Sequence, residues 1–203
     1  MSKQEKISRK RQLELTATQL FKEKGYTASS MRDLANEVGI EAASLYSHIK
    51  SKEEILRNIC FRMADEFFAA INAIDNEPMN SMAEKLEKYI VAHTEVIAHD
   101  TAATLVFINE WKHLSEPHYS NFVDQRHRYE KRFIEILKAG IKRKEFLPID
   151  EKFVVLTILS SLNWIPHWYK PGGKMSPEEI GRQLSRMLID GIKTGHRTGT
   201  RQH

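Results

Sequence analysis

Residues 29–56, SSMRDLANEVGIEAASLYSHIKSKEEIL, contain the pattern that decides the fold of this 203-residue chain. Ser29 or Ser30 can cap a short helix whose apolar residues recur at helical spacing, at Met31, Leu34, Ala35 and Val38. Gly39 follows at once and can adopt the left-handed conformation that ends a helix. The next helix, EAASLYSHI, is expected to bury Leu45 and Ile49. The pattern predicts two short helices joined by a tight turn, followed by the start of a third helix.

This arrangement is a helix-turn-helix, in which the second helix enters the major groove of DNA. Small residues at the start of the segment 41–49 let its backbone approach base edges, and the polar and basic residues that follow are placed to meet phosphates. We expect the DNA contacts to come from Ser30, Arg32, Ala42, Ala43, Ser44, Tyr46, Ser47, His48, Lys50 and Lys52. An αα-hairpin within an ordinary helical bundle is the alternative interpretation of the same pattern. The second helix is poor in large apolar residues, however, which makes it a weak core element.

The positive charge of the chain is concentrated at its N-terminal end. The whole chain has a formal net charge of +4, from 31 basic and 27 acidic residues. Residues 1–52 alone hold ten Lys or Arg against six Asp or Glu, so this segment has a net charge of +4 and the remainder is balanced. Contacts with DNA phosphates need such an excess. A solvated basic surface is the alternative explanation for so modest a number.

The segment ATQLFKEKGYTASSMRDLANEVGIEAASLYSHIKSKEEIL resembles the DNA-binding domain of the TetR family of bacterial transcriptional regulators. The positions that match the family pattern are Phe21, Gly25, Tyr26, Thr27, Ala35, Gly39, Leu45, Tyr46, Lys52 and Leu56. Two positions depart from it, since Ala43 replaces a common glycine and Ile49 replaces the usual phenylalanine. The resemblance implies a homodimeric repressor that a small molecule releases from a palindromic operator.

The amino-acid composition argues against several other classes of protein. Few glycines and prolines (9 and 6), with 41% hydrophobic and 29% charged residues, are typical of a soluble all-helical protein. Cys60 is the single cysteine, so no intrachain disulfide forms, and without a signal peptide or an apolar run of membrane length we expect a cytoplasmic protein. No HExxH motif, Cys/His cluster, nucleophile–base pair or glycine-rich phosphate loop occurs. We therefore expect no metal, no cofactor and no enzymatic activity.

The periodicity predicts an all-α fold of about nine helices. They are expected at residues 4–24, 30–38, 41–49, 51–73, 81–100, 101–114, 121–144, 150–169 and 176–191. We divide the chain into a DNA-binding domain at 1–52 and a larger helical domain at 53–195, which binds ligand and dimerises. The fourth helix, from residue 51, connects the two domains, and a mobile tail follows at 196–203.

The helix expected at 150–169 is apolar on more than one side, which an isolated surface helix does not tolerate. It is therefore buried on both sides, either by its own domain or by a second copy of the chain. The family resemblance implies a homodimer built by the last two helices, which suits a palindromic operator. The dimer contacts are expected at Leu159, Leu162, Ile165, Leu184 and Leu188.

The stretch NWIPHWYKPGGKMSPEEI, residues 163–180, resembles the corresponding part of a TetR subgroup that senses acyl-CoA thioesters of fatty-acid or aromatic-acid degradation. That resemblance implies that Trp164, His167, Trp168 and Lys170 meet the CoA moiety, unless the two tryptophans pack in the dimer interface. We expect the ligand pocket to be lined by Phe67, Phe68, Phe107, Glu110, Trp111, Phe122, Tyr129, Asn163, Trp164, His167 and Trp168. An ordinary aromatic core is the alternative for the middle helices. A multidrug-sensing regulator of the same fold, or a helical ligand-binding protein that does not bind DNA, are the alternative functions.

Overall fold

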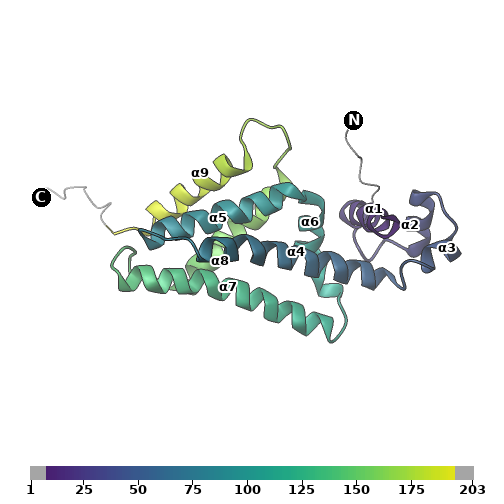
Figure 1. Cartoon of the computed structure of the whole chain (residues 1–203), viewed down its shortest axis with the longest axis horizontal. Helices are drawn as coiled ribbons and strands as arrows, with labels where there is room; N and C mark the ends of the chain where they lie inside the picture. Colours follow the sequence, from purple (N-terminus) through teal and green to yellow (C-terminus); the bar gives the residue numbers. More distant parts are fainter. Residues whose placement is uncertain (1–7, 195–203) are drawn as a thin grey trace, which may run out of the picture. The chain divides into compact units, whose positions relative to one another are not determined.

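The computed structural model describes residues 8–194, and its regular elements are helices (Figure 1). Over these residues there are nine α-helices and no strand; Phe146 and Lys193 form one isolated bridge. The α-helices are α1 Arg9–Lys24, α2 Met31–Val38, α3 Ala42–Tyr46, α4 Lys52–Asp75, α5 Met82–His99, α6 Thr101–Asn109, α7 His118–Lys142, α8 Glu151–Trp164 and α9 Pro177–Asp190, with 3₁₀ turns η1 Trp111–His113 and η2 Ile165–His167. The all-α fold of about nine helices is confirmed. Within the described residues no helix is both long and apolar enough to cross a membrane.

The chain packs as two compact units. Within the described residues, the first unit contains residues 8–64 together with Asp100–Asp124, and the second contains Asp65–His99 together with residues 125–194. Helices α4 and α7 each contribute to both units. The units differ from the division expected along the sequence, because the segment 100–124 packs with the N-terminal helices. The boundaries at 1–52 and 53–195 stay a prediction, and the tail 196–203 lies outside the described residues.

Helix α1 is the central element of the first unit. It begins at Arg9 rather than at residue 4, because the Ser8 hydroxyl caps it by accepting a hydrogen bond from the Arg11 N–H at 3.2 Å. Residues 4–7, where the sequence analysis began the helix, lie outside the described part of the chain. The apolar face buries Leu13, Ala17, Leu20 and Phe21, as its spacing predicts. Arg62 of α4 links α1 to the start of α6, with nitrogens 3.2 Å from Glu14 Oε1 and 3.3 Å from Asp100 Oδ2.

Three helix ends differ from the sequence prediction for local reasons. Helix α6 stops at Asn109 instead of continuing to Leu114, and the Glu110 carbonyl accepts the His113 N–H at 2.9 Å in the tighter η1 turn. Helix α7 begins earlier than expected, directly after Pro117, whose carbonyl accepts the Asn121 N–H at 3.1 Å. Helix α8 ends at Trp164 because Pro166 has no N–H to continue the ladder.

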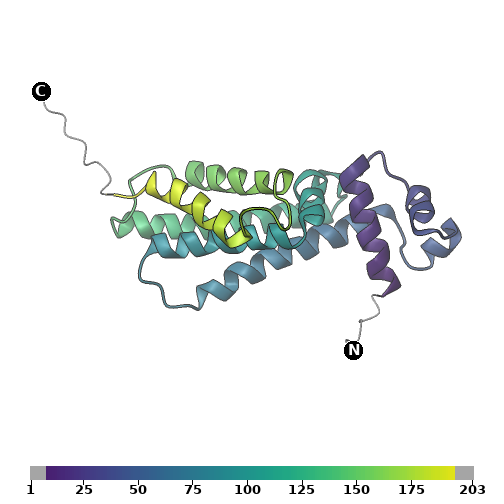
Figure 2. The same ribbon diagram turned by 90° about the horizontal axis from the view of Figure 1, so that it is seen from above.

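In the second unit α5 and α9 run side by side, as both views show (Figures 1 and 2). Gly181 of α9 makes the close approach possible, since a Cβ at this position would lie 2.8 Å from the Cα of Val91 on α5. The N-terminus of α9 carries a capping box in which Ser176 and Glu179 bond each other's backbone N–H groups. The pair α5–α9 thus forms a firmly packed part of this unit.

Candidate nucleic-acid interface and ligand-binding region

Helix α2 is capped at its two ends by the residues from which those ends were predicted, Ser30 and Gly39. The Ser30 hydroxyl accepts the Asp33 N–H at 3.1 Å, and Asp33 Oδ2 accepts the Ser30 N–H at 2.8 Å, which completes a capping box. The Ser30 hydroxyl also donates to Asp33 Oδ2 at 2.5 Å, and this bond, together with that from the Ser30 N–H, holds the pKa of the Asp33 carboxyl below its ordinary value. Gly39, with φ 73° and ψ 37°, ends the helix in the left-handed conformation. The turn into α3 is therefore fixed by local hydrogen bonds.

Helix α3 buries two anchors and exposes the rest of its surface. Leu45 is 0% exposed and Ile49 is 3% exposed, as predicted. The helix is shorter than the predicted 41–49, because the Ser47 hydroxyl donates to the Ser44 carbonyl at 2.7 Å and the backbone turns there. All of the expected DNA contacts on this segment are exposed, namely Ala42, Ala43, Ser44, Tyr46, Ser47 and His48. Ser30, Arg32 and Lys50 are exposed as well.

Lys52 differs from the other residues expected to contact DNA. Its Nζ donates to the carbonyls of Tyr26 and Ser29, both at 2.7 Å, and lies 4.1 Å from the centroid of the Tyr26 ring. Partial burial lowers the pKa of the Lys52 ammonium, although the nearby Glu110 carboxylate opposes the shift. Lys52 thus fastens the loop before α2, a structural role that the sequence analysis missed.

The segment after α6 packs on that same loop within the first unit. The His113 ring stacks on Tyr26 with centroids 5.4 Å apart, and Tyr26 meets Phe21 edge-on at 5.2 Å. His113 Nε2 lies 3.4 Å from both Glu110 Oε2 and Thr27 Oγ1. Glu110, expected in the ligand pocket, therefore belongs to this contact with the loop. Residues 86 positions apart in the sequence meet here, and no local pattern announces such a contact.

The aromatic residues expected in the ligand pocket form two groups, one in each unit. In the first unit the Phe122 ring packs against Phe107 at 5.3 Å, Trp111 at 5.7 Å and Phe61 at 6.0 Å. Phe122 is fully buried, whereas Phe107 and Trp111 are half-buried. The residues of this group come from α4, α6, η1 and α7. The segment just before His113, which contacts Tyr26, therefore also contains residues that were expected to line the ligand pocket.

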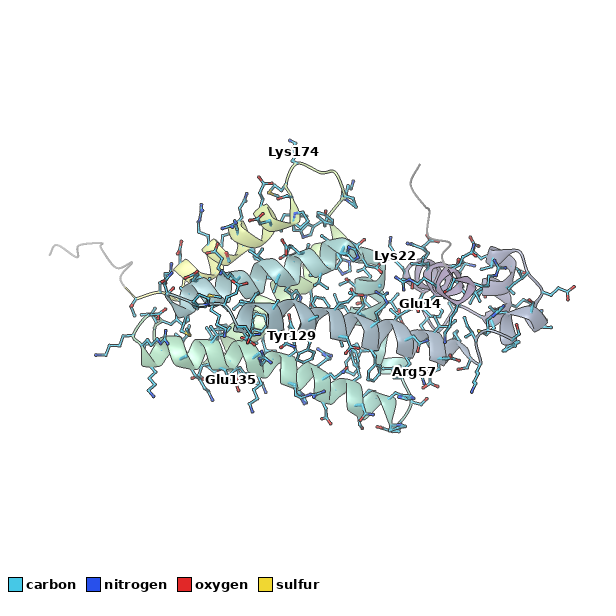
Figure 3. All side chains as sticks on the ribbon, in the orientation of Figure 1. Glu14, Lys22, Arg57, Tyr129, Glu135 and Lys174 are labelled. Carbon is cyan, nitrogen blue, oxygen red and sulfur yellow. The ribbon has the colours of Figure 1, made fainter. Side chains whose placement is uncertain are left out.

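The second group contains Phe67, Phe68 and Tyr129. The Tyr129 ring lies 6.0 Å from Phe67 and 5.4 Å from Phe68, and Figure 3 shows Tyr129 among the side chains between α4 and α7. His93 of α5 joins them, with its ring stacked on Phe67 at 4.4 Å and its Nδ1 2.9 Å from the Tyr129 hydroxyl. His93 is not among the residues that the sequence predicts for the pocket. The available signal was its position on the buried face of α5, in register with Leu86, Tyr89, Ile90, Thr94 and Ile97.

The residues expected near the CoA moiety lie at the end of α8, in η2 and in the segment directly after η2. Trp164 is 63% exposed and Trp168 is 45% exposed. The His167 ring stacks on Trp164 with centroids 4.5 Å apart and an interplanar angle of 27°. Asn163 is half-buried and Lys170 is exposed. The structure thus presents two large aromatic surfaces and a basic side chain to solvent along one short stretch.

The expected dimer contacts are not the most exposed apolar residues of α8 and α9. Leu162 and Ile165 are 0% and 1% exposed, so they belong to the core of their own unit, and Leu159, Leu184 and Leu188 are half-buried. The exposed apolar side chains of α8 share one side of the helix at spacings of three and eight residues, namely Phe153, Leu156 and Trp164. Met187 of α9 is 76% exposed. Helical periodicity alone did not tell the inner side of α8 from its outer side, since both are apolar.

Two family models match the chain. Residues 15–59 match the model for bacterial regulatory proteins of the tetR family, and residues 79–192 match the model for the tetracyclin repressor-like C-terminal domain. The HTH-type transcriptional repressor KstR2 of Mycolicibacterium smegmatis is 32% identical over 182 residues, which cover 89% of this chain and 88% of KstR2. KstR2 of Mycobacterium tuberculosis strain H37Rv is 30% identical over 187 residues, with coverage of 91% and 93%.

Solved structures agree with these relatives. The ketosteroid transcriptional regulator KstR2 of Mycobacterium tuberculosis has a TM-score of 0.87 at 29% identity and covers 94% of this chain and 98% of its own. AibR in complex with isovaleryl coenzyme A and operator DNA has a TM-score of 0.78 at 22% identity, with coverage of 90% and 98%, which is a likeness of fold. With both family models and the KstR2 relatives in agreement, the chain belongs to the TetR family of bacterial transcriptional regulators.

Proposed function

We propose that this protein is a homodimeric transcriptional repressor that an acyl-CoA effector releases from a palindromic operator. The observation that carries the proposal is the surface of the segment 41–50, in which Leu45 and Ile49 are buried while the small and polar residues and Tyr46 are exposed. The named relatives KstR2 are transcriptional repressors, which supports the same sign of regulation here.

DNA recognition in this proposal divides between base edges and phosphates. The small side chains Ala42, Ala43 and Ser44 at the start of α3 allow its backbone close to base edges in the major groove. Tyr46, His48 and Lys50 surround this start and contact phosphates. Arg32 and Ser30, which are exposed at the start of α2, extend the phosphate contacts, since a guanidinium and a hydroxyl both donate hydrogen bonds to phosphate oxygens.

Dimerisation in this proposal uses the exposed side of α8 with Met187 of α9. Phe153, Leu156 and Trp164 form an apolar stripe that one chain leaves uncovered. A second copy covers such a stripe symmetrically, and the resulting two-fold axis matches the symmetry of a palindromic operator. Leu159, Leu184 and Leu188, which are half-buried in one chain, extend the contact in this proposal.

The effector in this proposal places its acyl part among the aromatic side chains of the helical bundle. Its CoA part extends toward Trp164, His167, Trp168 and Lys170, where an adenine stacks on an indole and a basic side chain faces phosphates. The proposal is supported by AibR, a protein of similar fold whose structure was solved in complex with isovaleryl coenzyme A and operator DNA. Because α4 and α7 run through both units, effector binding is transmitted along them and changes the separation of the two α3 helices in the dimer.

A titration of the DNA-bound protein tests this proposal. The duplex is first selected from a random library with the purified full-length chain, and acyl-CoAs of several chain lengths are then added, with free CoA as the control. We expect release at micromolar acyl-CoA and a higher melting temperature, since a ligand that binds the folded state stabilises it. Release by a cationic drug-like compound and by none of the acyl-CoAs contradicts the effector class and favours a multidrug sensor. Failure to select any duplex contradicts the proposal as a whole.

A further inference from the structure

A buried group of side chains in the second unit contains polar atoms that the rest of the protein leaves unsatisfied. We name this group the His93–Tyr129 cluster, and it consists of the buried residues Phe67, His93 and Tyr129 together with Gln125, which is half-buried and whose Oε1 is buried. His93 is 4% exposed and Tyr129 is 9% exposed. Their side chains meet through Nδ1 and the phenol oxygen at 2.9 Å, while the Phe67 ring covers the imidazole at 4.4 Å.

Both titratable members of the cluster are uncharged. Burial lowers the pKa of His93 to about 3 and raises the pKa of Tyr129 above its ordinary value. A neutral imidazole has one donor and one acceptor nitrogen, and Nδ1 is already used by Tyr129. Nε2 therefore has the role opposite to that of Nδ1: it donates where Nδ1 accepts, and accepts where Nδ1 donates. If the Tyr129 hydroxyl donates to Nδ1, then Nε2 carries the proton and is a donor.

Two buried atoms of the cluster have no hydrogen-bond partner within residues 8–194. They are Nε2 of His93 and Oε1 of Gln125. Gln125 precedes Tyr129 by four residues on α7, so the two side chains share one face of that helix. Buried polar atoms in native proteins nearly always have a partner, and the exceptions need a role beyond folding. His93 is bonded to Tyr129, and Gln125 lies one helical turn before Tyr129 on α7; a donor on the first and an acceptor on the second fit a ligand group that is acceptor and donor at once.

We propose that His93 and Gln125 read a hydroxyl group on the apolar part of the effector. This inference rests on the proposed function, because it assigns a chemical feature to the effector that binds among α4, α5 and α7. The hydroxyl accepts from Nε2–H of His93 and donates to Oε1 of Gln125, which completes a hydrogen-bond chain that starts at Tyr129. A ketone satisfies only the donor on His93. A carboxylate faces the acceptor oxygen of Gln125, and an ammonium faces the donor on His93, so charged groups fit poorly.

The cluster lies one side chain away from the surface of its unit. Phe68 meets the Tyr129 ring at right angles, with centroids 5.4 Å apart, and is itself half-buried. The exposed Arg128 guanidinium lies 6.0 Å from the Phe68 ring. In this proposal an apolar ligand reaches the cluster past the half-buried Phe68 ring.

The test compares matched thioesters on the full-length protein by calorimetry. We expect wild-type protein to bind 3-hydroxyoctanoyl-CoA about tenfold or more tighter than octanoyl-CoA, with 3-oxooctanoyl-CoA between them, because a site built to bond a hydroxyl rejects the analogue that lacks it. Gln125→Met and His93→Leu each reduce this ratio to near one while octanoyl-CoA still binds. Gln183→Met, the same change at an exposed position of α9, keeps the wild-type ratio. Equal binding of octanoyl-CoA and 3-hydroxyoctanoyl-CoA by the wild type, or a ratio unchanged in both cluster variants, overturns the inference.

A second readout separates this inference from the acyl-CoA proposal. The ¹⁵N resonances of the His93 ring are followed in wild-type protein while cyclohexanol is added, with cyclohexylammonium as the charged control. We expect cyclohexanol to move the Nε2 resonance and the cation to leave it unchanged. If no acyl-CoA binds but cyclohexanol moves Nε2, the acyl-CoA proposal fails and the hydroxyl site stands. If neither cyclohexanol nor 3-hydroxyoctanoyl-CoA moves Nε2, the hydroxyl site is rejected.

Discussion

Helices α3 and α8 each bury one side in their own unit and expose the other, but the exposed sides differ in chemistry. Helix α3 buries Leu45 and presents small and polar residues to solvent. Helix α8 buries Val155, Ile158 and Leu162, yet it exposes Phe153, Leu156 and Trp164. A small polar side suits a hydrated, charged groove, whereas a large apolar side suits a second protein surface. The kind of side chain exposed, more than exposure itself, therefore separates the helix proposed to bind DNA from the helix proposed to form the dimer.

Changing the outer side of α8 is expected to have the largest effect. A Phe153→Glu/Leu156→Glu variant places two carboxylates in the proposed dimer contact, where burying an unpaired charge costs several kcal/mol. We expect monomers in sedimentation velocity, with the helical circular-dichroism signal intact, because both side chains are exposed in one chain.

Leu15→Glu is the matched control for the α8 variant, since Leu15 of α1 is also an exposed leucine, at 38%. It should keep the dimer. A double α8 variant that remains dimeric at micromolar concentration contradicts the role given to this side of the helix.

Changing the outer side of α3 should affect DNA and leave assembly alone. Ser44→Glu brings a negative charge to the base edges and phosphates, so we expect affinity for the selected duplex to fall by about tenfold or more. Lys50→Ala should weaken all DNA sequences alike and lower the salt slope by about one unit. Fluorescence anisotropy at several salt concentrations measures both effects, and unchanged affinity of Ser44→Glu contradicts the docking of α3. Lys174→Ala, an exposed lysine of the loop before α9, serves as the control for Lys50→Ala.

Lys50 and Lys52 are close in sequence but have different surroundings, so variants at the two positions separate an exposed lysine from a structural one. Because the Lys52 ammonium bonds two backbone carbonyls, Lys52→Met should lower the free energy of unfolding by about 1–3 kcal/mol. Lys50 is exposed, and Lys50→Met should change the same quantity by no more than about 0.5 kcal/mol. Urea unfolding followed by circular dichroism distinguishes them. Equal stability of the two variants contradicts the structural role given to Lys52.

The capping box of α2 gives the smallest effect, and one that depends on pH. The folded-state pKa of Asp33 is lowered by Ser30, so its stabilisation is complete above the ordinary carboxyl pKa and is lost as pH falls through the lower folded value. Ser30→Ala removes the cap and should lower stability by about 1 kcal/mol near neutral pH. The difference in melting temperature between wild type and Ser30→Ala should shrink toward pH 2. A difference that grows on acidification has the wrong sign for this cap.

The local features of this molecule were predictable from sequence, whereas contacts between distant segments were not. Ser30, Gly39 and Leu45 act within a few residues of their partners, and periodicity with capping chemistry was enough to predict α2, the turn and the buried side of α3. The stacking of Tyr26 on His113 joins segments far apart in the chain. Such pairing depends on how helices pack, which propensity and spacing do not specify.

The same distinction between local features and contacts of distant segments applies to the candidate sites. The exposed residues of α3 were predicted because a single short segment carries them. Lys52 was assigned to phosphate from its type and place in the motif, but its bonds to Tyr26 and Ser29 require the loop to fold back on α4. His93 was missed because the feature that distinguishes it is a ring nitrogen without a hydrogen-bond partner inside the second unit. A sequence shows the type and spacing of residues, but not which of their polar atoms find a partner.

Sedimentation equilibrium of the full-length protein with the selected, fluorescently labelled duplex tests the central claim most directly. The two faces are compared through wild type, Ser44→Glu and Phe153→Glu/Leu156→Glu. We predict a wild-type complex with an even number of chains on each duplex, a Ser44→Glu protein that is dimeric but free of DNA, and an α8 variant that is monomeric and binds the duplex weakly. A wild-type complex of one chain per duplex, or loss of the dimer in Ser44→Glu with its retention in the α8 variant, contradicts the assignment of α3 to DNA and α8 to the second copy.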